Sequence, residues 1–412
     1  MRILIYSYNY YPEPIGIAPL MTELAEGLAR RGHEVHVSTA MPSYPESEIY
    51  PEYRGKLYTR ERLNGISLAR CYVWSRTERN FRNRVFFELS FIFLSFWQCL
   101  RTPCPDLIFL TIPGLPVCLP GVILSKIYRR PLVLNVQDIL PDAAIHVGLI
   151  TNPQLINILR KLERFAYNNA DKISVITESF QNNLLKKGVP ENKLVEISNW
   201  VDINFIKPRE KTDSNFRQEN NLKDKFIVLY SGNIALTQGL ENLIEAGKYL
   251  KAIEQIVIVI VGEKKAIAQL KLQAEAKKLN NILLLPFQPR EKLPDMLGSA
   301  DIGLVMQKHN VINFNMPSKI QLLLASGCPI IASVPALGTA ALAVEKSQGG
   351  VVVPPENPQA LAQAIKDLYH QPDILKKLGE NGRKYAENYY SFEKVLDRYE
   401  ELFKSLVNQR EN

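Results

Sequence analysis

The sequence predicts an α/β protein built from two doubly wound, parallel-sheet domains, and three observations support this. The chain has 412 residues, 46% of them hydrophobic, which is more than one core normally holds. Short β-rich apolar runs alternate with helical patterns, as in parallel sheets with crossover helices. The alternation lapses once, in a polar, charged stretch around Lys207–Lys225. We therefore expect a first domain at residues 1–206 and a second at 207–390.

The first series of apolar runs begins with a βαβ unit. Leu20–Arg31 carries apolar residues at helical spacing and stops at Gly32, a favourable residue just beyond a helix end. The strands expected in this domain are Ile3–Tyr8, Glu34–Ser38, Leu107–Leu110, Leu132–Val136 and Lys172–Ile176.

The second series has the same character and ends in helices. Its expected strands are Phe226–Tyr230, Ile256–Val261, Ile282–Leu285, Ile302–Met306, Pro329–Ala332 and Gly350–Val353. Ser391 is a suitable N-cap for a last helix at Phe392–Leu406, within a C-terminal segment 391–412. Because ligands bind at the carboxyl ends of strands in open α/β sheets, the two domains are expected to face each other across a ligand-binding cleft.

The composition indicates the cellular compartment of the protein and the charge of its partners. The five cysteines show no paired CxxC spacing and no accompanying histidine cluster, which favours a reduced, cytosolic protein without a structural metal. Met1 leads directly into a strand-like run, so no secretory signal is expected. The net charge of +8 favours an anionic partner. No nucleic-acid-binding module is recognisable, so nucleic acid is not the expected partner.

One segment combines arginines with an apolar run. Its arginines are Arg76, Arg79, Arg82 and Arg84, followed by Val85–Leu100 and closed by Arg101. The run is too short for a membrane span and contains Glu88. We expect an interfacial helix on an anionic membrane surface; the alternative is a buried helix of the sheet domain with exposed arginines.

Two segments of the second domain favour an anion site. In VLYSGNIALTQGLENLIEA, the loop at Ser231, Gly232 and Asn233 precedes a helix that opens near Gly239, so backbone N–H groups converge there. The alternative is a plain tight connection between strand and helix.

In NMPSKIQLLLASGCPIIAS, Pro317 and Ser318 precede Lys319 at the start of a helix. A lysine there opposes the helix dipole, and a bound anion would relieve the mismatch. The alternative is a solvated lysine on a first turn.

These segments resemble a known family. PSKIQLLLASGCPIIA is similar to the donor-binding segment of the family-four retaining glycosyltransferases of the GT-B fold, and FQPREKLPDMLGSADIGLV is similar to their base-binding strand and helix. YNYYPEPIGIAPLMTELAEGLARRGHEVHV, MPSYPESEIYPEYRG, QDILPDAAIHVGLI and the loop YSGN…QGLENLIEA resemble the subgroup that contains the colanic-acid fucosyltransferase and the fucosamine transferases. The resemblance covers nearly the whole chain.

The resemblance implies a division of roles between the domains. The expected donor-binding residues are Gly232, Asn233, Gln238, Gly239, Gln288, Arg290, Leu293, Pro317, Ser318 and Lys319. The expected acceptor-binding residues are Glu13, Gly16, Asp138 and Asp142. Asp138 and Lys319 are the expected catalytic pair: Lys319 meets the charge of the leaving phosphate, and Asp138 orients the acceptor hydroxyl. An alternative role for Asp138 is to cap the Leu140–His146 region.

The sequence departs from the family pattern at three places. Two glutamates that many members carry eight positions apart are replaced by Phe314 and Leu322. A lysine usual in the subgroup near Leu236 or Thr237 is missing. Lys319, Arg290 or backbone N–H groups must then meet the phosphate charge.

The function that the resemblance implies is metal-independent, configuration-retaining transfer of a deoxy- or aminosugar in cell-surface polysaccharide biosynthesis. The donor is a UDP- or GDP-linked sugar, used as co-substrate without a further cofactor, and the acceptor is a lipid-linked saccharide or an oligosaccharide. Such an enzyme would lie at the inner face of the plasma membrane. A nucleotide-sugar epimerase on the same fold and a catalytically degraded scaffold protein of polysaccharide assembly remain alternatives.

Overall fold

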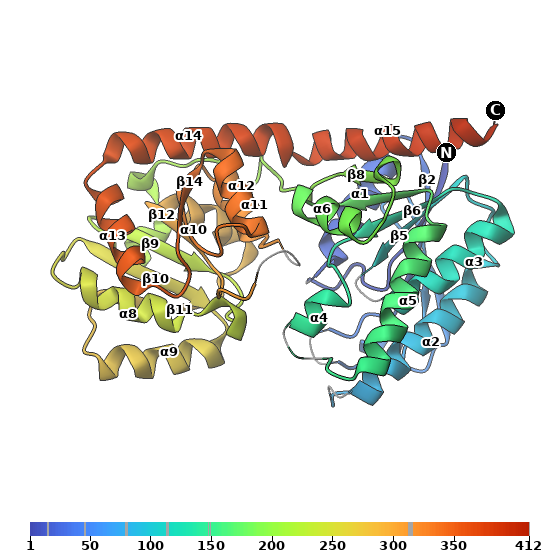
Figure 1. Ribbon diagram of the computed structural model, residues 1–412, viewed down its shortest axis with the longest axis horizontal. Helices are drawn as coiled ribbons and strands as arrows, with labels where there is room; N and C mark the ends of the chain where they lie inside the picture. Colours follow the sequence, from blue (N-terminus) through green and yellow to red (C-terminus); the bar gives the residue numbers. More distant parts are fainter. Residues whose placement is uncertain are drawn as a thin grey trace. The chain divides into compact units, whose positions relative to one another are not determined.

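The computed structural model describes residues 1–14, 16–44, 47–78, 81–112, 115–146, 148, 150–311 and 316–411. It divides into two compact units (Figure 1): unit 1 comprises Met1–Asn199 and Val395–Asn412, and unit 2 comprises Trp200–Lys394. Each unit has a sheet of mainly or wholly parallel strands with helices on both faces, which confirms the predicted fold class. The division falls after Asn199, whereas the sequence placed the first boundary after residue 206, and the last helix joins unit 1 from Val395 onward.

Unit 1 contains an eight-stranded sheet in the order β3-β4-β2-β1-β5-β6-β7-β8. The five strands expected from the sequence are β1 (Arg2–Tyr6), β2 (Glu34–Ala40), β5 (Leu107–Ile112), β6 (Leu132–Val136) and β7 (Lys172–Val175). All five are present within two residues of the expected ends. Three further strands are β3 (Tyr58–Leu63), β4 (Ile66–Cys71) and β8 (Leu194–Glu196).

Besides the short strand β8, the antiparallel pair β3–β4 is the part of this sheet that apolar runs did not predict. Its two-residue turn, Asn64-Gly65, has positive φ at both positions (50° and 82°), as a tight hairpin requires. β3 lies at the sheet edge and has polar, partly exposed residues, so it lacks the continuous apolar run of a buried strand. The dipeptide Asn-Gly was the available sequence signal.

The helices of unit 1 cover both faces of its sheet. They are α1 (Ala18–Arg30), α2 (Phe81–Cys99), α3 (Cys118–Tyr128), α4 (Asp142–His146), α5 (Pro153–Asn169), α6 (Glu178–Lys186) and most of α15 (Phe392–Glu411). Successive side chains of β5 point to opposite faces of the sheet and so contact different helices. The ring of Phe109 packs 5.4 Å from that of Tyr399 in α15, whereas Leu110 packs beneath α3. α2, α3 and α5 lie side by side on the face opposite α15 (Figure 1).

The last helix is held on unit 1 by charge as well as by its aromatic side chains. Arg31 pairs with Asp397 at 2.7 Å and with Glu400 at 2.8 Å. His33 Nε2 lies 3.0 Å from the other oxygen of Glu400. α15 therefore completes the core of the N-terminal sheet, although it is the end of the chain.

Unit 2 contains a six-stranded, wholly parallel sheet in the order β11-β10-β9-β12-β13-β14. Its strands are β9 (Phe226–Ser231), β10 (Ile256–Gly262), β11 (Ile282–Pro286), β12 (Ile302–Met306), β13 (Ile330–Ser333) and β14 (Gly350–Val353), which confirms all six expected strands. Its helices are α7 (Asn215–Glu219), α8 (Glu241–Leu250), α9 (Lys264–Ala276), α10 (Leu293–Ser299), α11 (Lys319–Ala325), α12 (Thr339–Ser347), α13 (Pro358–Tyr369) and α14 (Pro372–Tyr389).

The strand β10, which pairs with a neighbour on each side, shows how this sequence fills two cores. Ile258 and Ile260 pack with the apolar faces of α8, α9 and α13. Val259 and Val261 point to the other face and pack with residues of α10, α11 and α12. A strand buried on both faces is apolar at every position. The run IVIVIVG therefore indicated a strand even though apolar and polar residues do not alternate in it.

Candidate active site

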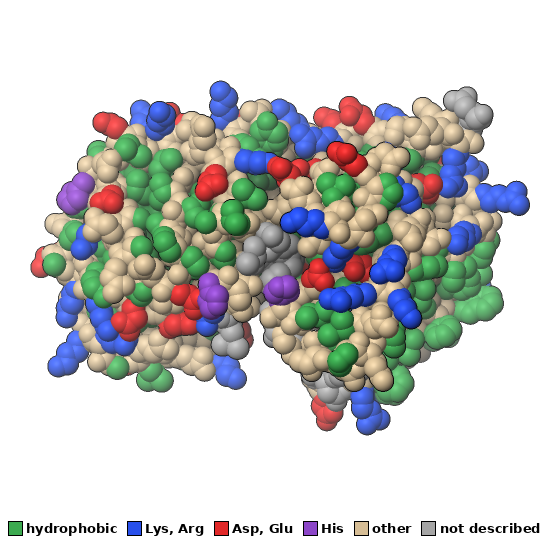
Figure 2. Space-filling view, in the orientation of Figure 1, with side chains coloured by type: hydrophobic (Ala, Val, Ile, Leu, Met, Phe, Trp, Pro, Cys, Tyr) green, Lys and Arg blue, Asp and Glu red, His purple; other side chains and the backbone are tan. Residues whose placement is uncertain are grey.

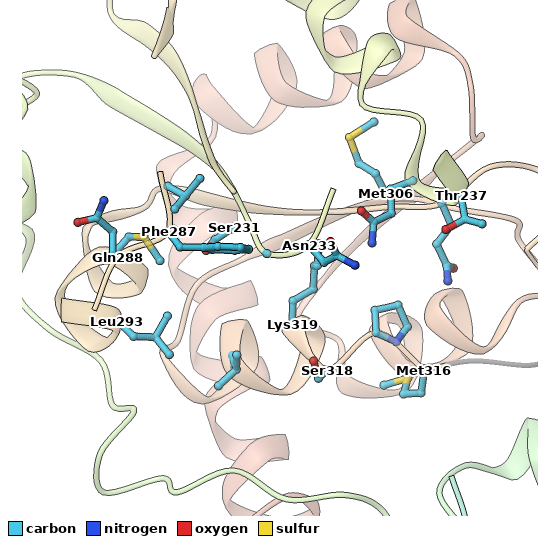
Figure 3. Close-up of a pocket in the computed structure, with 17 residues that line it drawn as sticks. Ser231, Asn233, Thr237, Phe287, Gln288, Leu293, Met306, Met316, Ser318 and Lys319 are labelled. Carbon is cyan, nitrogen blue, oxygen red and sulfur yellow. The ribbon is translucent and has the colours of Figure 1, made fainter. Parts of the chain in front are cut away.

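A cavity of about 420 Å³ lies in unit 2, at the carboxyl ends of β9, β10, β11 and β12 (Figure 3). This is the edge of an open parallel sheet at which ligands are expected. The lining residues are Ser231, Gly232, Asn233, Thr237, Gln238, Val261, Phe287, Gln288, Leu293, Met296, Met306, Gln307, Met316, Pro317, Ser318, Lys319 and Leu322. The structure thus brings together eight of the ten residues expected to bind a donor.

The loop after β9 approaches the amine of Lys319 closely at a glycine. Gly232 has φ of 136°, a conformation that L side chains rarely adopt, and its N–H donates to the carbonyl of Val261 at 3.1 Å. A Cβ at this position would lie 3.4 Å from both Cε and Nζ of Lys319. Glycine therefore suits this position because of its φ, and the loop backbone lies beside the amine.

Tyr230 and Gln238 fix the shape of this loop. The Tyr230 hydroxyl lies 2.7 Å from the Asn233 carbonyl oxygen and 2.6 Å from Gln238 Oε1. Gln238 Oε1 also accepts the N–H of Ala235 at 3.0 Å. Gln238 therefore positions the loop with its amide oxygen, besides lining the cavity.

Lys319, the first residue of α11, has a buried amine. Its Nζ is shielded from solvent and has no hydrogen-bond partner among the residues that the structure describes. It lies 3.7 Å from the centroid of the Tyr230 ring, a cation–π contact. Burial lowers the pKa of this amine to about 7. An ammonium group without an anionic partner in the lining favours an anionic ligand.

The segment before α11 contributes Pro317 and Ser318 to the lining, beside Lys319 (Figure 3). Of the two positions where a family carboxylate is replaced, Phe314 lies outside the described residues. Leu322 lines the cavity, so an apolar side chain occupies the place of that glutamate.

The opposite side of the cavity is largely apolar. Phe287, Leu293 and Met296 lie here, after β11 and in α10, and Phe287 is half exposed. The side-chain amide of Gln288 donates to the Pro286 carbonyl at 3.0 Å. A flat aromatic ring among flexible aliphatic side chains suits a planar, apolar ligand surface.

Two expected donor residues lie outside the lining. The guanidinium of Arg290 lies 5.7 Å from the centroid of the Phe205 ring. Gly239 adopts a left-handed conformation with φ of 62°, after the 3₁₀ turn Leu236–Gln238, and packs against the side chain of Lys308.

Lys308 is a residue that the sequence analysis missed. Its N–H donates to the Thr237 carbonyl at 2.8 Å, and its Nζ pairs with Glu241 at 2.9 Å. It therefore brings an amine to the loop in which the usual lysine is missing. No local pattern indicated this, because Lys308 follows β12 and reaches the loop only through the fold.

The expected acceptor residues belong to unit 1, where Glu13 has a clear structural role. Its Oε1 accepts the N–H groups of Ser43 and Tyr44 at 3.0 and 3.1 Å, and its Oε2 accepts the side-chain amide of Asn9 at 2.6 Å. Glu13 thus joins the loops after β1 and β2. Gly16 follows it with a positive φ of 65°.

Asp138 and Asp142 have different surroundings. Asp138, just after β6, is exposed at the surface, but neighbouring protein partly desolvates its carboxyl group and raises the pKa to about 6. Asp142, the first residue of α4, pairs with Lys187 at 2.9 Å, and Lys187 also contacts Glu163. Asp142 therefore shares one cationic partner with Glu163, whereas the carboxylate of Asp138 protonates near pH 6.

Comparison with known proteins identifies the family. Residues 16–200 match the glycosyl transferase 4-like domain, and residues 211–385 match the glycosyl transferases group 1. The chain is 33% identical over 408 residues to the putative colanic acid biosynthesis glycosyl transferase WcaI of Escherichia coli K12, covering 97% of this chain and 98% of that protein. This chain belongs to the family-four glycosyltransferases of the GT-B fold. The family resemblance seen in its sequence is thereby confirmed.

Solved structures of low sequence identity share the fold of this glycosyltransferase. Sucrose-phosphate synthase from Thermosynechococcus elongatus superposes with a TM-score of 0.76 at 18% identity, covering 99% of both chains. HepE of Anabaena, solved in complex with UDP, gives a TM-score of 0.71 at 18% identity, over 98% of this chain and all of that one.

Proposed function

We propose that this glycosyltransferase transfers a deoxy- or aminosugar, with retention of configuration, from a UDP- or GDP-linked donor held in the cavity of unit 2. The observation that carries the proposal is the buried amine of Lys319, which lies beside the Gly232 loop and has no hydrogen-bond partner in the described ranges of the chain. A diphosphate would supply the anionic partner that the amine lacks, and the apolar side with Phe287 suits a nucleobase. The UDP bound to HepE, a protein of the same fold, supports this choice of ligand class.

The proposed reaction breaks the bond between the anomeric carbon and the donor diphosphate. Negative charge then develops on the leaving phosphate oxygen, and the Lys319 ammonium stabilises it. Among the lining residues that the structure describes there is no Asp, Glu or His. This content supports transfer without a divalent metal and without a carboxylate nucleophile from the cavity. The acceptor oxygen would form the new bond to the anomeric carbon, the leaving phosphate would accept the proton of that hydroxyl, and Asp138 would orient the hydroxyl.

The proposed acceptor is a lipid-linked saccharide or an oligosaccharide of a cell-surface polysaccharide. Similarity to WcaI over almost the whole chain supports this, since that protein is assigned to colanic acid biosynthesis. A lipid-linked acceptor would place the enzyme at the inner face of the plasma membrane.

Isothermal titration with UDP, GDP and their sugar conjugates tests the donor part of the proposal. One nucleoside diphosphate should bind to wild type, and Lys319→Ala should weaken it by about 1.5 to 3 kcal/mol, the value of a charge-assisted hydrogen bond. Lys376→Ala, which removes an exposed lysine of the same unit, is the matched control. If both variants bind like wild type, Lys319 does not contact the donor.

Transfer is then followed with the bound donor, a panel of lipid-linked and free saccharides, and EDTA. Transfer that persists in EDTA and keeps the anomeric configuration of the donor supports the full proposal. Interconversion of donor sugars without an acceptor would identify an epimerase instead. Nucleotide binding without transfer or donor hydrolysis would identify a scaffold protein.

A further inference from the structure

One face of unit 1 exposes apolar side chains along neighbouring helices. On α2, Phe86, Leu89, Phe93 and Trp97 are 43–62% exposed, and on α3, Ile123 and Ile127 are 44% and 52% exposed. Figure 2 shows apolar side chains gathered over α2 and α3 at the edge of unit 1. We call these six residues the α2–α3 face. Apolar side chains concentrated on one surface mark an interaction site.

The opposite side of α2 explains why the helix keeps this orientation. Phe91 is fully buried, with its ring 5.4 Å from that of Tyr6 in β1, and Gln98 donates to the Arg70 carbonyl at 2.9 Å. The four exposed residues fall at i, i+3, i+7 and i+11, a stripe about 16 Å long at 1.5 Å per residue. The sheet fixes one side of the helix, so the apolar stripe on the other side faces solvent.

Charge around the face favours an anionic partner. α2 and α3 contain one carboxylate, that of Glu88, and Arg84 pairs with it at 2.8 Å. Exposed cations lie on α3 and in the segments that include or adjoin the helix ends: Arg76, Arg82, Arg101, Lys126 and Arg129. A second copy docking through the same face would meet the same cations, which disfavours a symmetric dimer.

Tryptophans lie toward both ends of the face. Trp97 is at the end of α2, and Trp74 packs beside Phe86 with ring centroids 5.9 Å apart. The guanidinium of Arg76 lies 4.3 Å from the centroid of the Trp74 ring. Indole rings beside cations are typical of the boundary between lipid headgroups and acyl chains.

We propose that the α2–α3 face docks unit 1 onto the surface of an anionic lipid bilayer. The aromatic and aliphatic side chains enter the boundary of the acyl chains, and the surrounding cations contact headgroup phosphates. The segment lies on the membrane without crossing it: in the described parts of the chain, no helix is long and apolar enough to span a bilayer. Of the expected arginines, Arg79 lies outside the described residues, and Arg84 also contacts the Tyr8 hydroxyl at 3.1 Å.

Docking would also bring the bilayer near the loop that follows β1. Arg84 connects the start of α2 to Tyr8, and Glu13 and Gly16 follow in the same loop. A lipid-linked acceptor could then reach these residues from the headgroup layer. This last step rests on the proposed function, whereas binding of the face to lipid does not.

The test is co-sedimentation of the full chain with vesicles of phosphatidylglycerol mixed with phosphatidylcholine, and with phosphatidylcholine alone. Wild type should bind the anionic vesicles, and added salt should weaken binding without abolishing it. Phe93→Ser combined with Trp97→Ser should bind roughly tenfold more weakly or worse, because two large apolar side chains no longer enter the bilayer. Both residues are more than half exposed, so circular dichroism should show an unchanged fold.

The matched control combines Leu272→Ser and Ile374→Ser, which removes exposed apolar side chains of unit 2. This variant should bind vesicles like wild type. A charge variant with Arg76, Arg82 and Arg101 changed to Ser should lose most of the salt-sensitive part of the binding. It leaves Arg84 in place, because that residue also supports α2 against Tyr8.

Lipids brominated in the acyl chains identify which side chains insert. In a variant with Trp74 and Trp200 changed to Phe, these lipids should quench the fluorescence of Trp97. Equal sedimentation of wild type and the Phe93/Trp97 variant would overturn the proposal. The proposal would also be overturned if wild type does not bind vesicles but forms a dimer in light scattering, and the Phe93/Trp97 variant dissociates that dimer. Since donor titration needs no lipid, failure of docking and failure of the proposed function are measured separately.

Discussion

Replacing Lys319 with Met should stabilise the ligand-free protein. Burial lowers the pKa of the amine from 10.5 to about 7. Since each pKa unit corresponds to about 1.36 kcal/mol, the folded state carries the charged amine at a cost of up to about 4 to 5 kcal/mol. Relaxation and water entry reduce this cost, and Met fills a similar volume without charge. We expect the free energy of unfolding of unit 2 to rise by about 1 to 3 kcal/mol at pH 7.

The gain should depend on pH in a defined direction. Because the pKa of Lys319 is lower in the folded than in the unfolded chain, the unfolded state binds more protons between about pH 7 and pH 10.5. The free energy of unfolding of wild type therefore rises with pH through this window by the contribution of Lys319. The Met variant lacks that contribution, so its advantage is greatest at and below pH 7 and disappears toward pH 10.5.

Urea unfolding followed by fluorescence measures this effect in unit 2 alone. Trp200 is the one tryptophan of that unit and is buried near Phe392, so replacing Trp74 and Trp97 with Phe leaves a single reporter. Lys376→Met, at an exposed position, is the matched control and should leave stability nearly unchanged. A Lys319→Met protein that is no more stable than wild type at pH 7 would refute the assignment of an uncompensated buried ammonium group.

The other predictions concern the site loops and the acceptor side. Gly232→Ala should weaken donor binding and lower stability by about 1 to 3 kcal/mol, because a residue with a Cβ is strained at φ of 136° and the loop beside Lys319 would have to shift; titration and urea unfolding measure both effects. Asp138→Asn should slow transfer while leaving nucleotide affinity unchanged, and the wild-type rate should fall below about pH 6 as the carboxylate protonates; a collapse of nucleotide affinity would contradict the division of roles. Lys308→Ala should weaken donor binding less than Lys319→Ala, since Lys308 is already paired with Glu241; an effect as large as that of Lys319→Ala would place its amine on the donor. Glu13→Ala should lower the thermal stability of unit 1, since three donors lose their acceptor, and an unchanged melting temperature would show that these bonds contribute little.

The sequence alone was sufficient for eleven strands of the two sheets, but not for β3, β4 and β8. Strands buried on both faces consist of continuous apolar runs such as Ile256–Gly262, and that pattern is local. The same holds for the Gly232 loop and for Lys319, which lie directly after β9 and at the start of α11. Each segment by itself favoured an anion site, and the family resemblance implied that both bind one donor.

Tertiary structure decided how those side chains meet. The Lys319 amine is shielded from solvent beside Tyr230, which belongs to a strand distant in sequence. Lys308, which follows β12, contacts the loop after β9. α2 exposed its apolar stripe because its other side is occupied by the sheet. The spacing of apolar residues in the sequence indicates which residues lie on the same side of a helix or strand. Burial, ion pairing and pKa depend on which other element covers that side, and contacts between residues far apart in the chain determine that.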